Sequence, residues 1–405
     1  MDDAARWLKD REALGFSKRG EARALRSFRE MLGAVFAELT VESYEKLYPR
    51  RDGKGAEPVW VCRCVCGGAV SMRTSALQNG DRKNCGRCAE KLGTNWTELQ
   101  LRRLALSVEF EGTLGVYSVA GPKLIIGVRD YSDVLVRTLC AEFGMGNVTY
   151  AQPKWHGRIA QWQVTGLEAA VLARHVAPYM VCKKQQAELV AGFSIKSHSS
   201  GKVTAEIQSE RMRLRARTKE LNRRGPRDPD PAWAPLAAEW IAWAANAPAE
   251  NRYELLAWAI EWEGYICIRE KPSASSVGGL THSPVVGLSQ VAHRGCLLNV
   301  VNALSGGLGK LSGVLRPQRE TWAPMQCWTV TGFTDAKRLA AGLAPHLKCK
   351  KRLAELVQEF PEWPHAPEPM PKSVLDKRRE LAAESKLVNA YDYEYRSLFE
   401  EDDPP

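Results

Sequence analysis

Two nine-residue segments of this chain, LALSVEFEG and LAWAIEWEG, each end in an acidic residue followed by glycine. The acids are Glu111 and Glu263, and the following glycine predicts that each lies at the C-terminus of a helix. The helix dipole makes that end unfavourable for an anion, and second acids, Glu109 and Glu261, lie two positions earlier. A divalent cation would compensate this negative charge, so the pattern predicts a metal site.

Cysteines supply a second set of candidate ligands. The run WVCRCVCGG is followed, further along the chain, by CGRC. A structural zinc ion needs four soft ligands, and two short turns that each carry a pair of cysteines provide them. We therefore expect structural Zn²⁺ on Cys64, Cys66, Cys85 and Cys88, with Cys62 as an alternate ligand. The competing interpretation is that these cysteines are reduced thiols without a metal.

The acidic segments open two stretches that share five landmarks in the same order. LIIGVRD, EFGMGNV, QWQVTG and APYMVCKKQQAEL follow the first segment, and VVGLSQ, GGLGKL, CWTVTG and APHLKCKKRLAEL follow the second. This order predicts a duplicated α+β domain, each copy running as helix, two strands, helix, two strands, helix. The expected divisions are a helical segment at 1–36, a zinc-binding module at 37–95, repeat 1 at 96–198, a basic helix and Pro-rich linker at 199–250, repeat 2 at 251–365, and a C-terminal helix with an acidic tail at 366–405.

Composition limits the location and partners of the protein. The 405 residues include 57 Lys and Arg against 47 Asp and Glu, a formal charge of +10, and 44% are hydrophobic. This is a globular composition, which excludes a fibrous or wholly disordered chain. No apolar run approaches the roughly 20 residues that cross a bilayer, and the N-terminal MDDAARWLKDRE lacks the apolar stretch of a signal peptide. We expect a cytoplasmic protein that does not enter membranes and that binds a polyanion.

The two acidic segments and their landmarks resemble the two copies of the LAGLIDADG motif in a single-chain LAGLIDADG homing endonuclease. The resemblance covers about 99–195 and 251–360. It implies a monomer with two αββαββα halves about a pseudo-twofold axis, whose antiparallel four-stranded sheets form a saddle over double-stranded DNA. Leu106 and Trp258 depart from the family pattern, because a small glycine usually stands at this motif position.

The resemblance also implies a chemistry. In the family, the penultimate acid of each motif ligates catalytic metal ions, here Mg²⁺ or Mn²⁺, and it corresponds to Glu111 and Glu263. A family lysine corresponds to Lys183 and Lys350, whose charge would offset negative charge on the phosphate. Gln290 matches a residue that helps to place the attacking water. The implied function is a site-specific double-strand DNA endonuclease that hydrolyses phosphodiesters and leaves staggered 3′ overhangs.

Basic and amide side chains on the strands and their loops are candidates for contacts to bases and phosphates. Arg211 and Arg215 lie four positions apart on the predicted linker helix, where they face either solvent or phosphate. The cysteine-rich segment resembles zinc-binding modules found beside nuclease domains in phage and mobile-element proteins. The strand and loop candidates are Lys123, Arg129, Lys154, Arg158, Gln161, Gln163, Arg269, Lys271, Arg316 and Arg319.

Other interpretations stay open from the sequence alone. The same scaffold can bind nucleic acid without cutting it, as an RNA-splicing maturase or a DNA-binding regulator. The acids can be helix ends in inactive copies, and Lys183 and Lys350 can be ordinary solvated lysines. A nuclease centred on the cysteine cluster is disfavoured, because no histidine lies near it in the sequence.

Overall fold

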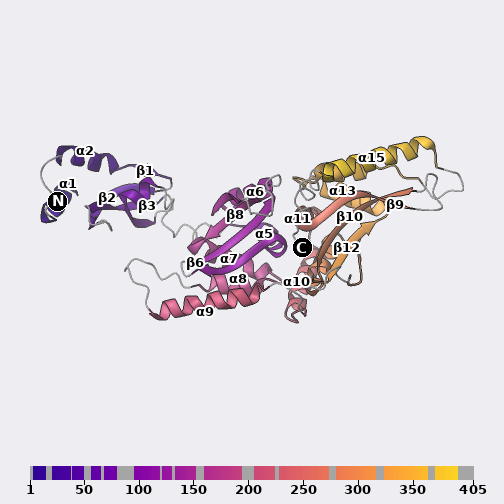
Figure 1. Ribbon diagram of the computed structural model, residues 1–405, viewed down its shortest axis with the longest axis horizontal. Helices are drawn as coiled ribbons and strands as arrows, with labels where there is room; N and C mark the ends of the chain where they lie inside the picture. The colour runs from indigo at the N-terminus through magenta and orange to yellow at the C-terminus, as the bar shows by residue number, and fades with distance from the viewer. Residues whose placement is uncertain are drawn as a thin grey trace, which may run out of the picture. The chain divides into compact units, whose positions relative to one another are not determined.

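The computed structural model of the protein describes 3–14, 21–37, 39–49, 56–64, 68–79, 95–118, 121–129, 133–151, 159–193, 205–223, 228–272, 280–315, 323–363 and 370–390. The chain divides into two units, Met1–Asn95 and Trp96–Pro405 (Figure 1). Among the described residues, no helix combines the length and apolar content needed to cross a bilayer.

The N-terminal unit combines helices with one antiparallel sheet. Its elements are α1 (Asp3–Ala13), α2 (Glu21–Met31), β1 (Val35–Phe36), β2 (Leu39–Pro49), β3 (Ala56–Cys64), β4 (Ala69–Arg73) and α3 (Thr74–Gln78). The sheet order is β1-β2-β3-β4, so each strand pairs with its neighbour in sequence. Short connections between sequential antiparallel strands give this simple meander.

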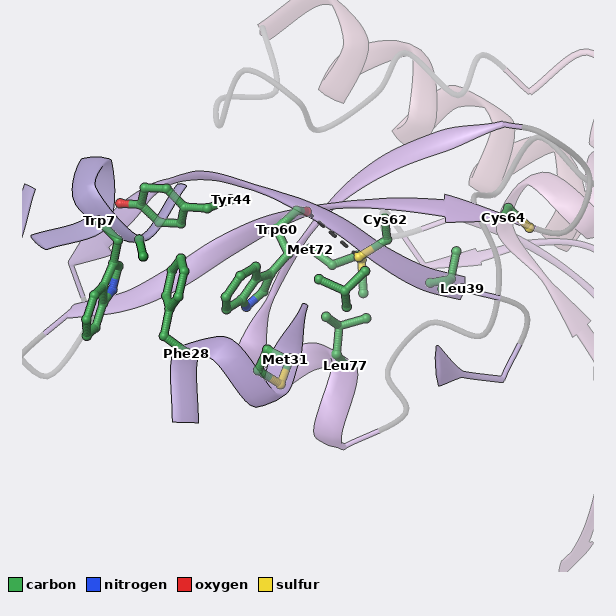
Figure 2. Close-up of a cluster of buried hydrophobic side chains, with 12 residues drawn as sticks. Trp7, Phe28, Met31, Leu39, Tyr44, Trp60, Cys62, Cys64, Met72 and Leu77 are labelled. Carbon is green, nitrogen blue, oxygen red and sulfur yellow. Dashed lines mark hydrogen bonds between the residues drawn. The ribbon is translucent and has the colours of Figure 1, made fainter. Parts of the chain in front are cut away.

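An aromatic cluster joins the helices of this unit to its sheet (Figure 2). The Phe28 ring of α2 lies 4.7 Å from the Trp7 ring of α1 and 4.8 Å from the Trp60 ring of β3. The Tyr44 hydroxyl donates a hydrogen bond of 2.6 Å to the Asp10 carboxylate. Because large aromatic side chains contribute much of a small core, the helical segment predicted at 1–36 packs as part of the same unit as the sheet.

Repeat 1 confirms the predicted order of elements. They are α5 (Glu98–Glu111), β5 (Gly112–Ser118), β6 (Gly121–Arg129), α6 (Asp133–Phe143), β7 (Asn147–Ala151), β8 (Ile159–Thr165), α7 (Gly166–Val176), η2 (Ala177–Tyr179) and α8 (Lys184–Ala191). The antiparallel sheet has the order β5-β6-β8-β7. At the start of α5, Thr97 and Gln100 form a reciprocal capping box, which fixes where the helix begins.

Repeat 2 has the same organisation. Its elements are α11 (Ala249–Glu263), β9 (Gly264–Pro272), β10 (Leu280–Val291), η4 (Ala292–Arg294), α12 (Cys296–Leu304), β11 (Lys310–Leu311), β12 (Met325–Thr331), α13 (Phe333–Leu343) and α14 (Lys351–Glu359). Its sheet order, β11-β12-β10-β9, is antiparallel. The fold prediction of two αββαββα halves with antiparallel sheets is therefore confirmed.

Helices cover one face of each sheet, and the side chains of the strands alternate accordingly. Trp162 in β8 and Trp328 in β12 are fully buried on the helix side. Their neighbours Gln161, Gln163 and Cys327 are half-buried on the opposite face. Within the described residues, the sheet of each repeat therefore leaves one face free of its own helices.

The helices that carry the acidic motifs, α5 and α11, pack against each other. The Trp262 indole donates a hydrogen bond of 2.9 Å to the Ser107 hydroxyl across this contact. Arg103 of α5 forms an ion pair of 2.9 Å with Glu254 of α11 and lies over the Trp258 ring. The bulky Trp258 at the usual glycine position is thus accommodated by an arginine that also joins the two helices.

The linker between the repeats contains a helix that was not predicted from the sequence, α10 (Trp233–Asn246). The Arg102 guanidinium of α5 lies 4.6 Å from the Trp240 ring centroid and 4.4 Å from that of Trp243. The Trp240 indole also donates a hydrogen bond of 2.8 Å to the Tyr179 carbonyl. Since α10 packs on α12 as well, it connects repeat 1 with repeat 2.

A further helix follows each repeat, α9 (Ala205–Leu221) after repeat 1 and α15 (Lys372–Ala390) after repeat 2. The Thr218 hydroxyl accepts a hydrogen bond of 3.0 Å from the Val116 N–H of edge strand β5. The Ser385 hydroxyl accepts the equivalent bond of 3.2 Å from the Ile268 N–H of edge strand β9. Each helix therefore satisfies polar backbone groups of a sheet edge.

The two edge helices also dock through equivalent arginines. Arg211 is 6% exposed and lies over the Phe193 ring, while Arg378 is 5% exposed and lies over the Phe360 ring. The matching contacts indicate that the duplicated unit includes the edge helix, although the sequence analysis assigned these residues to a linker and a C-terminal segment.

Candidate metal and nucleic-acid site

Glu111 and Glu263 are the last residues of α5 and α11, and both side chains are exposed. The surrounding protein reduces the hydration of the Glu111 carboxyl, and this desolvation, together with the nearby Glu263 carboxylate, raises its pKa to about 7. Desolvation also raises the pKa of Glu263, although the positive charges of Arg294, Lys183 and Lys350 act to lower it. The structure therefore brings the two predicted acids and the two predicted lysines into one electrostatic cluster.

Both lysines close the C-terminal end of a motif helix. The Lys183 ammonium donates hydrogen bonds of 2.5–3.0 Å to carbonyl oxygens at the end of α5, and Lys350 does so at 2.7–3.0 Å for α11. The acceptors are Val108, Glu109 and Gly112 for Lys183, and Ile260, Glu261 and Gly264 for Lys350. A cation at this position also opposes the negative end of the helix dipole. These lysines are therefore not ordinary solvated lysines.

Burial lowers the pKa of Lys183 to about 7, and it lowers the pKa of Lys350 as well. Only the protonated ammonium has the three N–H donors that the three carbonyl acceptors use. Each lysine is thus half-buried, and its ammonium form is fixed beside an exposed carboxylate.

The second acids, Glu109 and Glu261, are compensated by the protein itself, which corrects the expectation that a cation neutralises them. The Glu109 carboxylate accepts hydrogen bonds from the Val181 and Lys183 N–H groups at 2.7 and 3.0 Å. The Glu261 carboxylate accepts bonds of 2.6–3.2 Å from the N–H groups of 348–350. Charged acceptors strengthen such bonds, so each acid fixes the turn that carries its repeat's lysine.

Arg294 is a functional candidate that the sequence analysis missed. Its guanidinium donates hydrogen bonds of 2.8 Å to both the Glu109 carboxylate and the Glu109 carbonyl. Both side chains of this ion pair are largely buried, at 14% and 1% exposure. The equivalent segment of repeat 1, residues 130–132, reads Asp-Tyr-Ser and lies outside the described residues. In the sequence, the signal that could have identified Arg294 is its place four residues after Gln290, where repeat 1 has no arginine at the equivalent position.

Gln290 lies near the end of β10, 6% exposed, and its side-chain oxygen accepts a hydrogen bond of 2.9 Å from the Val291 N–H. The strand register places Leu288 opposite Gly264 and Ile126 opposite Gly112. Counting from these pairs, the equivalent of Gln290 in repeat 1 is Val128. The two repeats therefore differ at this position.

The sheet faces opposite the helices carry part of the predicted DNA-contacting set. Lys123, Gln161 and Gln163 are half-buried there in repeat 1, and the two glutamine side chains share a hydrogen bond of 2.9 Å. In repeat 2, Arg269 is half-buried and Lys271 is exposed on β9. These side chains provide donors and acceptors on the free faces of both sheets.

Other predicted DNA contacts are placed differently. Arg211 is buried against Phe193, so its guanidinium is not offered to solvent, which corrects its assignment as a phosphate contact. Arg215 of α9 is half-buried, and Arg129 ends β6. Lys154, Arg158, Arg316 and Arg319 lie outside the described residues.

The described part of the cysteine cluster lies on β3. Cys62 is buried among aromatic and aliphatic side chains, and its thiol donates to the Trp60 carbonyl (Figure 2). Burial and Glu42 raise the pKa of Cys62 to about 11, which disfavours the thiolate that zinc requires. Cys66, Cys85 and Cys88 lie outside the described residues. Among the residues that are described, no group of three or more His, Cys, Asp or Glu side chains is placed to hold a metal ion.

The acids at the ends of α5 and α11 fit a hard divalent cation. Their carboxylates are exposed, close enough for one to raise the other's pKa, and they lie beside fixed positive charges. Mg²⁺ is usually bound by one or two carboxylates and retains several waters. The donor set therefore suits Mg²⁺ or Mn²⁺ and not a soft metal.

Comparison with solved structures places the fold among LAGLIDADG endonucleases. The LAGLIDADG meganuclease I-AabMI bound to uncleaved DNA is 15% identical with a TM-score of 0.50, covering 70% of this chain and 98% of that chain. The I-LtrWI homing endonuclease bound to target DNA is 14% identical with a TM-score of 0.48, covering 71% and 97%. The I-SmaMI homing endonuclease bound to cleaved DNA is 15% identical with a TM-score of 0.44, covering 70% and 95%. The sequence matches no protein family and no curated protein.

Proposed function

We propose that this protein is a site-specific DNA endonuclease that cuts both strands of double-stranded DNA with the help of divalent metal ions. The carrying observation is the cluster formed by Glu111, Glu263, Lys183 and Lys350 at the ends of two packed helices. Two carboxyls with raised pKa values, one of them raised in part by the charge of the other, are a costly arrangement for stability alone. A function that binds cations there accounts for it.

In the proposed site, Glu111 and Glu263 hold Mg²⁺ or Mn²⁺. The bound ions supply Lewis-acid activation of the phosphodiester and of a water. Lys183 and Lys350 keep a positive charge beside the carboxylates, which favours their ionised form and attracts the phosphate backbone. Gln290 is proposed to help to place the attacking water, as the resemblance implies. Arg294 is a positioning residue, because it acts through the Glu109 carboxylate.

The DNA is proposed to lie against the free faces of the two sheets, with the protein acting as a monomer. Lys123, Gln161, Gln163, Arg269 and Lys271 lie on those faces and can contact base edges and phosphates. The DNA-bound states of I-AabMI and other similar structures support DNA as the partner. The four candidates outside the described residues stay part of this proposal.

A structural Zn²⁺ in the N-terminal unit is a separate proposal, with Cys64, Cys66, Cys85 and Cys88 as ligands. Cys64 is the last residue of β3, and its N–H donates a hydrogen bond of 2.8 Å to the Gly68 carbonyl. Metal analysis of the purified chain should find one zinc per molecule. Cys88→Ser should lose the zinc, whereas Cys140→Ser should retain it, and equal zinc content in both variants would contradict the assignment.

The endonuclease proposal is tested in two steps that separate binding from cutting. Double-stranded DNA pools are first selected for binding in Ca²⁺, and the selected sequences are then incubated with Mg²⁺. The wild-type chain should produce double-strand breaks that chelation by EDTA prevents. The double variant Glu111→Gln/Glu263→Gln should bind the same DNA and leave it intact.

Each outcome has a consequence for the proposal. Cutting by the double variant at the wild-type rate would refute the site. Robust and specific binding without cutting by the wild type would instead favour the non-catalytic alternative, a DNA-binding regulator or, if RNA competes, a maturase.

A further inference from the structure

Two cysteine sulfur atoms meet at the junction of the repeats. The Sγ atoms of Cys182 and Cys296 are 3.6 Å apart, although the residues are 114 positions apart in sequence. Cys182 immediately precedes the lysine that closes α5, and Cys296 begins α12. A disulfide has an S–S bond of about 2.05 Å, so a local movement of roughly 1.5 Å would allow the sulfurs to bond.

The surroundings give the two thiols different accessibility. Cys182 is 6% exposed, whereas Cys296 is half-buried and lines a pocket of about 300 Å³ together with Trp233, His293 and Gln326. A small reagent can therefore reach Cys296 from the pocket. Cys182 is not among the residues that line this pocket, and its sulfur contacts the Cys296 sulfur.

The charges around the pair favour the same order of reaction. The hydrogen bond from Cys182 lowers the pKa of Cys296, and Arg294 contributes to this effect. Burial raises the pKa of Cys182. Because the thiolate is the nucleophile in disulfide exchange, Cys296 should react first.

We propose that Cys182 and Cys296 form an inter-repeat disulfide by exchange with a low-molecular-weight disulfide such as glutathione disulfide. The Cys296 sulfur attacks one sulfur of the reagent, which breaks its S–S bond, releases one thiol and leaves a mixed disulfide. The Cys182 sulfur then attacks the Cys296 sulfur and releases the second thiol. Two protein thiols are oxidised to one disulfide, the reagent is reduced to two thiols, and their protons come from the cysteines.

The disulfide would disturb the contacts that position the lysine of repeat 1. Glu109 binds the N–H groups on either side of Cys182 and also the Arg294 guanidinium, two residues before Cys296. Drawing the sulfurs together moves both of these partners of Glu109. Resting on the proposed nuclease function, the expected consequence is a roughly 10²-fold slower cleavage, as a displacement of about 1 Å near a reacting centre can cause.

The test uses the full-length chain, reduced and then exposed to mixtures of reduced and oxidised glutathione. After blocking of free thiols and digestion without reductant, mass spectrometry should find a peptide pair that joins Cys182 to Cys296, two hydrogens lighter than the sum. Dithiothreitol should reverse both the linkage and the loss of cleavage. Cys349→Ser is the matched control, because Cys349 holds the equivalent position in repeat 2 and its removal should leave the linkage intact.

The variants distinguish the disulfide from other effects of oxidant. Cys182→Ser and Cys296→Ser should each keep their cleavage rate in oxidised glutathione, and Cys182→Ala provides a second replacement should the serine disturb folding. Absence of the linked peptide, or glutathione on Cys296 that Cys182 never displaces, would overturn the proposal. If the linked peptide forms but the chain never cuts DNA, the disulfide proposal stands and the proposed function is rejected.

Discussion

The two repeats share the contacts that hold their lysines, but they differ in how the neighbouring acid is neutralised. In both, a glutamate carboxylate binds the turn before the last core helix, and the lysine of that turn closes the motif helix. In repeat 1, Glu109 also pairs with Arg294 from the other repeat. In repeat 2, Glu261 Oε2 is buried and has no hydrogen-bond partner in the described part of the chain.

This difference shows which contacts of the site are the same in both repeats. Backbone contacts recur because both copies must present a carboxylate and a lysine in the same way. Among the described residues, Glu109 has an arginine partner and Glu261 has none, so the two half-sites are chemically unequal there. We therefore expect the two DNA strands to be cut at different rates, and the following substitutions test that expectation.

The largest effect should come from the exposed acids. Glu111→Gln or Glu263→Gln removes the negative charge of a proposed metal ligand, and each should reduce double-strand cleavage by at least about 10²-fold. Both should raise the melting temperature, because repulsion between the carboxylates is removed. Cleavage of each labelled strand and thermal unfolding measure these outcomes, and a lower melting temperature in both variants would contradict the electrostatic account.

Removal of either lysine should destabilise the protein to a similar extent. Lys183→Met or Lys350→Met leaves three carbonyl oxygens without their charged donor, and each should lower the free energy of unfolding by about 2–4 kcal/mol. Chemical denaturation measures the loss. The neighbouring variants Lys184→Met and Lys351→Met serve as controls and should stay within about 0.5 kcal/mol of wild type. Clearly unequal losses of unfolding free energy for Lys183→Met and Lys350→Met would show that the two lysines do not contribute equally to stability.

The arginine gives the sharpest test of the asymmetry. Arg294→Met should lower the free energy of unfolding by about 3 kcal/mol, because it leaves the buried Glu109 carboxylate without its charged partner. Glu109→Gln should cost more than Glu261→Gln, and combining it with Arg294→Met should be less than additive by about 1 kcal/mol or more. Equal losses for the two glutamine variants would show that the repeats are energetically alike here.

A smaller effect is expected from pH. Since the pKa of Glu111 is raised to about 7, the carboxyl takes up a proton as the pH falls below that value, and cleavage should fall by about tenfold per pH unit. For folding, the sign is opposite, because the raised pKa favours the protonated native state and this stabilisation is lost as the pH rises from about 4.5 to 7. In Glu111→Gln, both the cleavage rate and the free energy of unfolding should lose this dependence on pH. If the pH profile of the unfolding free energy is unchanged in the variant, Glu111 is not the group that causes it.

The sequence predicted those features that depend on periodicity and repetition. The repeated landmarks and alternating strand residues were sufficient to predict the order helix, two strands, helix, two strands, helix in both repeats. Lys183 and Lys350 were singled out by the resemblance to the LAGLIDADG family. The partner of Glu109 was not predictable, because Arg294 is 185 positions away and only the packing of the repeats brings them together. Likewise, Arg211 was predicted to face solvent or phosphate, since nothing in its helix indicated that Phe193 covers it.

The edge helices have a consequence for dissecting the molecule. Because α9 supplies the Thr218 hydroxyl to β5, a fragment ending before Ala205 would expose a strand edge with unpaired N–H and C=O groups, which invites aggregation. A fragment extending through Asn222 keeps that edge covered, and Asn222 itself donates to the Leu114 carbonyl. Anyone exchanging halves between such proteins should therefore place the junction after this helix, in the connector that leads to α10.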